Sequence, residues 1–256
     1  MKQSSTLLFL VMVIMVFTIL ILSTRTYGSV ETIADDNQDY RLSLMPETKF
    51  YDEYEKIMAP DNTVVIYPIL TQTAYSWKGI HDYYSGYCDD CTTVKIEDHY
   101  GPIYSIGGNS FRVLEFLGYD VIDDIDIDKN PVILDKYDSV VLLHNEFITQ
   151  KEFNAIQNHK NIIYLYPGAL KNQVSIDYQS HSMSLIRGPD FPEKTITNGF
   201  DWALDNSINE ANTSCKEWSF EKIDNGYMLN CYPEYKILDD IMLLEKIKEL
   251  SYIHVN

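Results

Sequence analysis

Two short apolar runs separated by a stretch with helical spacing constrain the fold of this chain more than any other feature. The runs cover residues 139–143 and 161–166, and residues 150–158 between them have the spacing of an amphipathic helix. Apolar strands that alternate with helices are typical of a βαβ unit, in which both strands lie parallel in one sheet. The polar triplet His144-Asn145-Glu146 directly follows the first run. Because ligands bind at the carboxyl ends of strands in open α/β sheets, this triplet is the leading candidate for a functional site.

The rest of the chain repeats this alternation of strands and helices. Further strands are predicted at residues 63–70, 92–96, 119–122, 184–186, 218–223 and 227–231, and further helices at residues 105–117 and 237–247. Gly118 stands where a glycine commonly ends a helix, and Asn225-Gly226 is a strong hairpin signal. The predicted fold class is α/β, with a mostly parallel sheet, helices on both of its faces, and a C-terminal β-hairpin and helix.

Separate predictions apply to the polar segments after the first strand and to the acidic run at residues 124–128. Residues 71–75 follow the first strand and are predicted as a polar turn, and residues 76–87 as an irregular, lid-like segment. The acidic run at residues 124–128 has the spacing of a calcium loop, but Lys129 stands where that loop requires glycine. Because isoleucines alternate with these acids, a strand with one solvated face is the preferred interpretation.

The N-terminus has the composition of a secretory signal peptide or a membrane anchor, predicted for residues 1–28. Lys2 gives a basic start, and residues 7–22 are apolar apart from Thr18. This run is shorter than the roughly 20 residues of a transmembrane helix, so cleavage and retention in the cell membrane both stay open. Residues 29–60 are predicted as a spacer and residues 61–256 as a single extracytoplasmic α/β domain.

The charge of the chain restricts its partners. The sequence holds 38 acidic and 20 basic residues, which gives a formal net charge of −18. Nucleic acid is excluded because phosphate binding requires a basic face, and a polybasic contact with lipid is excluded for the same reason. A small-molecule ligand fits the strand-end triplet, and the N-terminal segment is the predicted membrane contact if it stays uncleaved. The sequence does not indicate an oligomeric state.

The chain contains four cysteines, Cys88, Cys91, Cys215 and Cys231, which favour disulfides in an exported protein. Of the three pairings that four cysteines allow, the local one is preferred, Cys88 with Cys91 and Cys215 with Cys231. Redox activity is disfavoured because two aspartates separate the first two sulfurs, and zinc because the second pair is not closely spaced. Asn212 begins the only N-glycosylation sequon, Asn-Thr-Ser.

His144 and Glu146 are the candidate catalytic residues. Alternate side chains of an extended segment point to the same side, so both could face one site as acid, base or ligand. A second interpretation stays open, in which Glu146 caps the following helix and His144 forms a local hydrogen bond. The chain has no Gly-x-Ser-x-Gly motif and no glycine-rich phosphate loop.

The βαβ unit with its strand-end triplet resembles the class I glutamine-amidotransferase-like group of flavodoxin-type folds. The resemblance implies a flavodoxin-like sheet and a nucleophilic cysteine on a sharp turn after a central strand. No cysteine follows residues 140–143 or residues 162–166. Glutaminase chemistry by a cysteine–histidine pair is therefore not expected.

His144-Asn145-Glu146 also resembles a motif in the C-terminal part of the N,N-dimethylformamidase large subunit. That family is associated with a mononuclear iron held by two tyrosines and a glutamate, with a histidine two residues before the glutamate. Over residues 63–170, the resemblance implies Glu146, Tyr75 and Tyr104 as metal ligands, iron as the cofactor, and His144 as a proton shuttle. The whole chain is also similar to exported archaeal proteins without an established activity.

Two functions follow from these observations. The first is an extracytoplasmic amidotransferase-like domain without the cysteine nucleophile, which is non-catalytic or binds a ligand. The alternative is a metal-dependent hydrolase of small amides. The alternative requires Glu146 to lie within ligand reach of at least one tyrosine hydroxyl.

Overall fold

The chain divides into two compact units, Met1–Thr48 and Lys49–Asn256. The computed structural model describes residues 52–97, 106–202, 204, 209–210 and 212–253, and the backbone of residues 30–34 and 40–44. In the first unit, β1 (Val30–Ala34) and β2 (Tyr40–Leu44) pair antiparallel. All other described elements belong to the second unit.

The predicted signal peptide or membrane anchor at residues 1–28 lies outside the described residues. Within the part of the chain that the structure describes, no helix is both long and apolar enough to cross a membrane. The predicted spacer ends at residue 60, whereas the structural division falls after Thr48. The first helix of the second unit, α3 (Tyr54–Ile57), therefore lies within the segment predicted as a spacer.

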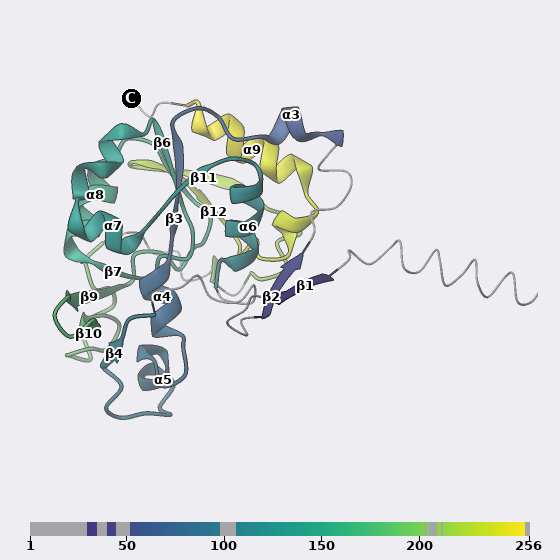
Figure 1. The fold of residues 1–256 in the computed structure, drawn as a ribbon. Coiled ribbons are helices and arrows are strands. Elements are labelled where there is room, and N and C mark those ends of the chain that lie inside the picture. Colours follow the sequence, from purple (N-terminus) through teal and green to yellow (C-terminus); the bar gives the residue numbers. More distant parts are fainter. Residues whose placement is uncertain are drawn as a thin grey trace, which may run out of the picture. The chain divides into compact units, whose positions relative to one another are not determined.

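Six strands of the second unit form one sheet in the order β11, β12, β8, β6, β3 and β5. They cover, in that order, Phe220–Ile223, Gly226–Leu229, Ile162–Tyr164, Ser139–Leu142, Thr63–Tyr67 and Asp120–Asp123. Every neighbouring pair is parallel except β11 with β12, which is antiparallel. The prediction of an α/β fold with a mostly parallel sheet is confirmed (Figure 1).

Helices pack on both faces of this sheet and bury two apolar layers. Besides α3, the described helices of the second unit are α4 (Ile69–Ala74), α5 (Ile80–Tyr84), α6 (Gly108–Phe116), α7 (Asp124–Lys129), α8 (Gln150–Asn158) and α9 (Ile241–Ser251), with the 3₁₀ helices η1 (Pro131–Lys136) and η3 (Lys236–Leu238). Successive side chains of a strand point to opposite faces. Val64 and Ile66 of β3 therefore pack with α7 and α8, and Val65 packs in the layer that contains α6 and α9 (Figure 1).

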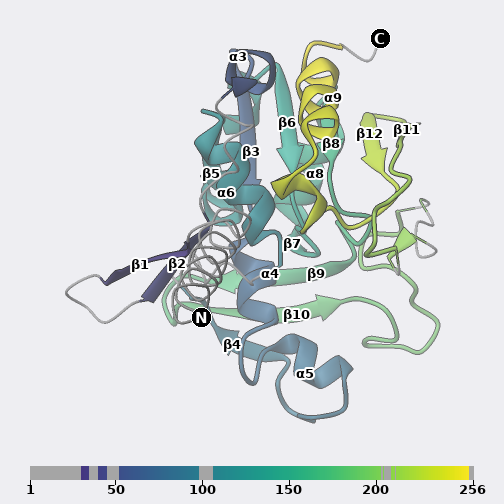
Figure 2. The same ribbon diagram turned by 90° about the vertical axis from the view of Figure 1, so that its right-hand side faces the viewer.

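A second sheet of four strands, in the order β4, β10, β9 and β7, meets the carboxyl end of the first. Its strands cover Thr93–Lys95, Ser182–Arg187, Asn172–Asp177 and Phe147–Thr149. β9 and β10 run across the ends of β3 and β6 (Figure 2). The sequence prediction lacks β7 and β9 because β7 has only three residues and β9 has few apolar side chains. The polar triplet thus connects β6 of one sheet with β7 of the other.

Residues 71–75, predicted as a polar turn, belong mostly to a buried helix, α4 (Ile69–Ala74). The prediction is wrong because the polar side chains of this helix bond to other segments. Thr71 Oγ1 accepts the N–H of Phe147 at 2.9 Å. A hydroxyl that is hydrogen-bonded in this way is buried without the cost of an unpaired polar group.

Residues 124–128, predicted as a strand with one solvated face, form the helix α7 (Asp124–Lys129) instead. A capping box starts this helix. The N–H of Asp126 donates to Asp123 Oδ1 at 2.9 Å, and the N–H of Asp123 donates to Asp126 Oδ2 at 3.3 Å. These bonds satisfy backbone donors that the first helical turn leaves free, and they override the alternating pattern of the isoleucines.

Both predicted disulfides are present, Cys88–Cys91 and Cys215–Cys231, and no cysteine of the chain is free. They close loops of very different length, with sequence separations of 3 and 16 residues. Disulfides persist in oxidising compartments, so both fit an extracytoplasmic environment.

Replacing Cys215 and Cys231 by serine is expected to lower the free energy of unfolding by about 3 kcal/mol, because the bond closes a loop of that length in the unfolded chain. The Cys88→Ser, Cys91→Ser variant is expected to lose less, since its loop is short. Urea unfolding without reductant measures both losses. Equal losses in the two variants would contradict the argument from loop length.

Candidate functional site

The backbone of the polar triplet is fixed by the neighbouring connection of the sheet. The N–H of Leu170 donates to the carbonyl of Asn145 at 2.9 Å. The N–H groups of Lys171 and Asn172 both donate to the carbonyl of Glu146, at 3.1 and 2.8 Å. The connections that leave β6 and β8 are therefore joined through their main chains, and the triplet lies at the junction of the two sheets.

The triplet also lies where the chain connections of the six-stranded sheet change direction. The chain runs from β3 to its neighbour β5 on one side, and then through α7 and η1 to β6 on the other side of β3. In open parallel sheets, ligands bind in the crevice at such a point, beyond the carboxyl ends of the strands. Tyr75, the C-cap residue of α4, follows β3 at the same edge.

Glu146 is buried and hydrogen-bonded at both carboxylate oxygens. Tyr75 Oη donates to Oε2 at 2.7 Å, and Asn172 Nδ2 donates to Oε1 at 2.9 Å. Glu146 does not cap the following helix, because Thr149 is the N-cap residue of α8 and accepts the N–H of Glu152 at 3.2 Å. The interpretation of Glu146 as a helix cap is therefore wrong.

Asn172 holds Glu146 in place and is itself held by Tyr84. Tyr84 Oη donates to Asn172 Oδ1 at 2.9 Å, so the amide of this buried asparagine is paired at both ends. Gly188 leaves the space for this contact. A Cβ atom at Gly188 would lie 2.1 Å from Asn172 Oδ1 and 2.3 Å from Tyr84 Oη.

His144 connects Glu146 with a second tyrosine, Tyr232. Its Nε2 atom lies 3.6 Å from Glu146 Oε2 and 3.2 Å from Tyr232 Oη. The imidazole ring is buried and stacks on Tyr166, with ring centroids 5.4 Å apart. Among the described residues, Nδ1 of His144 has no hydrogen-bond partner. Tyr75, Glu146, His144 and Tyr232 thus form one continuous group, named here the Tyr–Glu–His cluster.

Tyr232 is the member of the cluster that sequence reasoning missed. It follows Cys231, whose disulfide with Cys215 ties this segment beside the end of β12. A Cβ atom at Gly168 would lie 2.6 Å from Tyr232 Oη and 2.9 Å from His144 Nε2, so glycine makes room for both side chains. In the sequence, only the neighbouring Cys231 indicates that Tyr232 is held in a fixed position. The cysteine does not indicate which strand end Tyr232 reaches.

Two other predicted site residues, Tyr104 and Asn212, have different outcomes. Tyr104, the second tyrosine ligand that the resemblance implies, lies outside the described residues. Asn212 is half-buried, and its Nδ2 donates to the carbonyl of Asn230 at 3.2 Å. Glycosylation of Asn212 stays a prediction.

Burial controls the protonation of the cluster. It raises the pKa of Glu146 from 4.5 to about 7, against the opposing effects of the Tyr75 hydrogen bond and the charge of Lys171. Burial, together with the charge of Lys171, lowers the pKa of His144 from 6.5 to about 3. The pKa values of Tyr75 and Tyr232 are raised above 10.0 by burial and then by the charge of Glu146.

At neutral pH the cluster therefore contains a neutral imidazole, two protonated phenols and a partly ionised carboxyl. Glu146, rather than His144, is the group that gains or loses a proton near neutrality. Lys171 lies at the rim of the cluster and pairs with Glu210, with Nζ 3.0 Å from Oε1. The arrangement can bind a polar ligand, exchange one proton, or supply oxygen donors to a cation.

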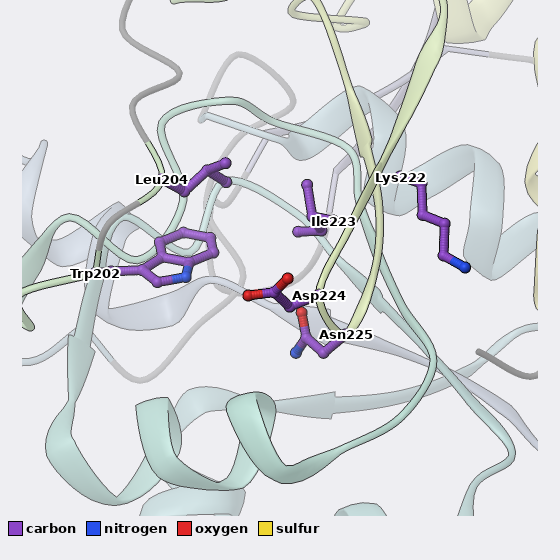
Figure 3. Close-up of a pocket in the computed structure, with 6 residues that line it drawn as sticks. All are labelled: Trp202, Leu204, Lys222, Ile223, Asp224 and Asn225. Atoms are coloured by element: carbon purple, nitrogen blue, oxygen red, sulfur yellow. The ribbon is translucent and has the colours of Figure 1, made fainter. Parts of the chain in front are cut away.

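A pocket of about 320 Å³ lies elsewhere, at the amino end of β12. It is lined by Trp202, Leu204, Lys222, Ile223, Asp224 and Asn225, and the side chain of Lys222 points away from Trp202 (Figure 3). None of the predicted site residues lines it. Because parallel sheets bind ligands at the opposite, carboxyl edge, this pocket does not displace the Tyr–Glu–His cluster as the candidate site.

Comparison with protein-family models finds no match to this chain, and comparison with curated protein sequences finds no match either. The assignment to an amidotransferase-like family therefore stays a prediction.

The Glu146→Gln substitution is expected to flatten the pH dependence of stability. A pKa raised from 4.5 to about 7 means that the protonated carboxyl favours the folded state below pH 4.5, and that this stabilisation is lost as the pH rises through about 7. Between these two limits of pH, the contribution of Glu146 to the free energy of unfolding changes by about 3 kcal/mol. Urea unfolding of both proteins across this pH range measures it, and parallel pH profiles would contradict the burial of an ionisable Glu146.

Proposed function

We propose that this chain is an extracytoplasmic amidotransferase-like protein that lacks the cysteine nucleophile and binds a small polar ligand at the Tyr–Glu–His cluster. The observation that carries the proposal is the position of the cluster, beyond the carboxyl ends of β3 and β6 where the chain connections change direction. Such a crevice is the usual ligand site of open α/β sheets.

The strand order supports the flavodoxin-like part of this proposal. The parallel strands, numbered along the chain as β3, β5, β6, β8 and β12, lie in the spatial order 2-1-3-4-5. This is the order of flavodoxin-like folds, in which the ligand binds between the first and third strands. The antiparallel strand β11 extends the sheet at the edge, in line with the proposed C-terminal β-hairpin.

The cysteines support the absence of glutaminase chemistry. All four are bound in disulfides, so none is free to act as a nucleophile. His144 follows β6 after one residue, at the strand end where the amidotransferase-like enzymes that the chain resembles place their cysteine.

The exposure of the side chains indicates what kind of ligand fits. Tyr75, Tyr84 and Tyr232 are half-buried, whereas Glu146 and Asn172 are buried beneath them. A ligand would therefore meet phenol hydroxyls first and the carboxylate below. These groups donate and accept hydrogen bonds, which suits a small neutral molecule such as an amide.

Binding of formamide, acetamide and N,N-dimethylformamide, followed by saturation-transfer NMR, tests this function. At least one amide is expected to bind the wild-type protein, and Glu146→Gln is expected to weaken that binding by about tenfold, the loss of one charge-assisted hydrogen bond. Asp128→Asn, at a carboxyl that accepts from Tyr178 at 2.7 Å outside the cluster, is the matched control. Equal binding by wild type and Glu146→Gln, or binding by neither, would overturn the proposed site.

A second candidate function, a metal-dependent hydrolase of small amides, is favoured by one specific contact. Tyr75 Oη lies 2.7 Å from Glu146 Oε2, which is within the ligand reach that this function requires. Tyr232 supplies a second phenol oxygen, which contacts His144, and His144 in turn lies 3.6 Å from Glu146.

The donor set suits a hard cation. Phenolate and carboxylate oxygens favour ions such as ferric iron, and Glu146, Tyr75 and Tyr232 would hold it. When bound, such an ion would polarise an amide carbonyl. In this function Asn172 orients Glu146 through the 2.9 Å bond to Oε1, and the neutral His144 holds a hydrogen bond with Tyr232.

Titration of the purified protein with ferric citrate tests the second candidate. Coordination by tyrosinate is expected to produce a visible charge-transfer band, which Tyr75→Phe and Tyr232→Phe each weaken. Tyr178→Phe, which removes a tyrosine–carboxylate bond outside the cluster, should leave the band unchanged. Absence of the band in the wild-type protein would exclude this function and leave amide binding as the test of the first.

A further inference from the structure

Two buried carboxyl groups lie together beneath the polar triplet. Asp124 begins α7 and Glu152 lies in the first turn of α8, and neither has exposed surface. Each side chain acts directly on the pKa of the other, and both carboxyl oxygens of Glu152 lack a hydrogen-bond donor among the described residues. A carboxyl buried without a donor is costly to ionise, so the pair is expected to hold a proton.

The hydrogen bonds around Asp124 indicate which of the two carries the negative charge. Asp124 Oδ2 accepts the N–H of Leu70 at 2.9 Å, and Oδ1 accepts a hydrogen bond from Asn145 Nδ2. Among the described residues, neither carboxyl oxygen of Glu152 accepts a hydrogen bond. Asp124 is therefore the acceptor, and Glu152 carries the proton.

The charges near the pair make the loss of that proton unfavourable. The charge of Asp123, the N-cap residue of α7, acts on Asp124, and the charge of Asp128 in α7 acts on Glu152. Burial raises the pKa of both Asp124 and Glu152. Lys151 of α8 lies 3.5 Å from a carboxylate oxygen of Asp128, which also accepts from Tyr178. Within the described residues, no lysine or arginine forms an ion pair with Asp124 or Glu152.

We propose that Asp124 and Glu152 share one proton and, through the side chain of Asn145, act as positioning residues for the His144–Glu146 turn. Asn145 is the middle residue of the triplet and connects two structures. Its side chain bonds to Asp124, and its carbonyl accepts the N–H of Leu170. His144 and Glu146 on either side belong to the Tyr–Glu–His cluster.

Loss of the shared proton would place two negative charges side by side without solvent. Because that state is costly in a buried site, Glu152 would move away from Asp124, and the anchor of Asn145 would move with it. The turn is therefore coupled to pH by a group that does not contact the ligand site. This coupling does not depend on what the cluster binds.

Infrared spectroscopy of the full chain tests for the shared proton. The carbonyl stretch of a protonated carboxylic acid is expected at neutral pH in the wild-type protein and is expected to lose intensity in Glu152→Gln. Asp128→Asn, one helical turn from Asp124, should keep the band. Equal intensity in the wild type and Glu152→Gln would overturn the proposal.

Hydrogen exchange tests the positioning role without any ligand. The N–H groups of residues 170–172 bond to the triplet, so their protection, corrected for intrinsic rates, reports on the turn. In the wild type this protection is expected to fall as the pH rises through the titration of the pair. Glu152→Gln keeps a donor for Asp124 without a titratable proton, so it should remove the part of the fall that the pair causes, and its protection should fall less than that of the wild type over the same pH range.

Asp124→Asn provides a second variant, because its amide oxygen can still accept from Asn145 while its amide nitrogen gives up the bond from the Leu70 N–H. Only one titratable carboxyl then remains, so two charges no longer meet and the fall in protection should be smaller than in the wild type. The same fall in protection in wild type, Glu152→Gln and Asp124→Asn would overturn the positioning role. Failure of amide or iron binding would not affect either result, so the two proposals are tested separately.

Discussion

The hydrogen bonds between the connection after β6 and the connection after β8 support the rest of the site. They join the carbonyls of Asn145 and Glu146 to the N–H groups of residues 170–172, at the place where the six-stranded sheet meets the four-stranded one. Because the main chain fixes both connections, their side chains have defined directions. Asn172 reaches Glu146 from the second connection, and Gly168 of the same connection leaves space for His144 and Tyr232.

The triplet distributes its polar side chains between two environments. Glu146 and His144 enter a group that contains the half-buried tyrosines Tyr75 and Tyr232. Asn145 between them bonds instead to Asp124, in an acidic pair without exposed surface. Burial raises the pKa of Glu146 on one side and the pKa values of Asp124 and Glu152 on the other. Two acidic sites with raised pKa values are thus built on one short turn.

Local patterns made part of this structure predictable. The helix at residues 150–158 was predicted at the bounds of α8, because an amphipathic segment follows Thr149, whose hydroxyl caps it. The strands β3, β6 and β8 were recognisable because central parallel strands are apolar on both faces. For the same reason, the triplet could be assigned to a strand end. Tyr75 was singled out by resemblance to a known motif, and it does contact Glu146.

The remainder depended on contacts between distant segments. The polar residues of α4 are buried because they bond to groups far along the chain, as Thr71 does to Phe147. The helix α7 forms because one capping box outweighs the alternation of isoleucines. Tyr232 reaches His144 across 88 positions of sequence, through a strand and a disulfide whose placement no local pattern specifies.

A double-mutant cycle between Tyr75→Phe and Glu146→Gln tests most directly whether the cluster exists as a unit. The free energies of unfolding of the wild type, both single variants and the double variant give the coupling between the two side chains. A bond of 2.7 Å between buried groups predicts a coupling of about 1 kcal/mol or more. Additivity of the two substitutions within about 0.5 kcal/mol would contradict the contact on which the proposed site is built.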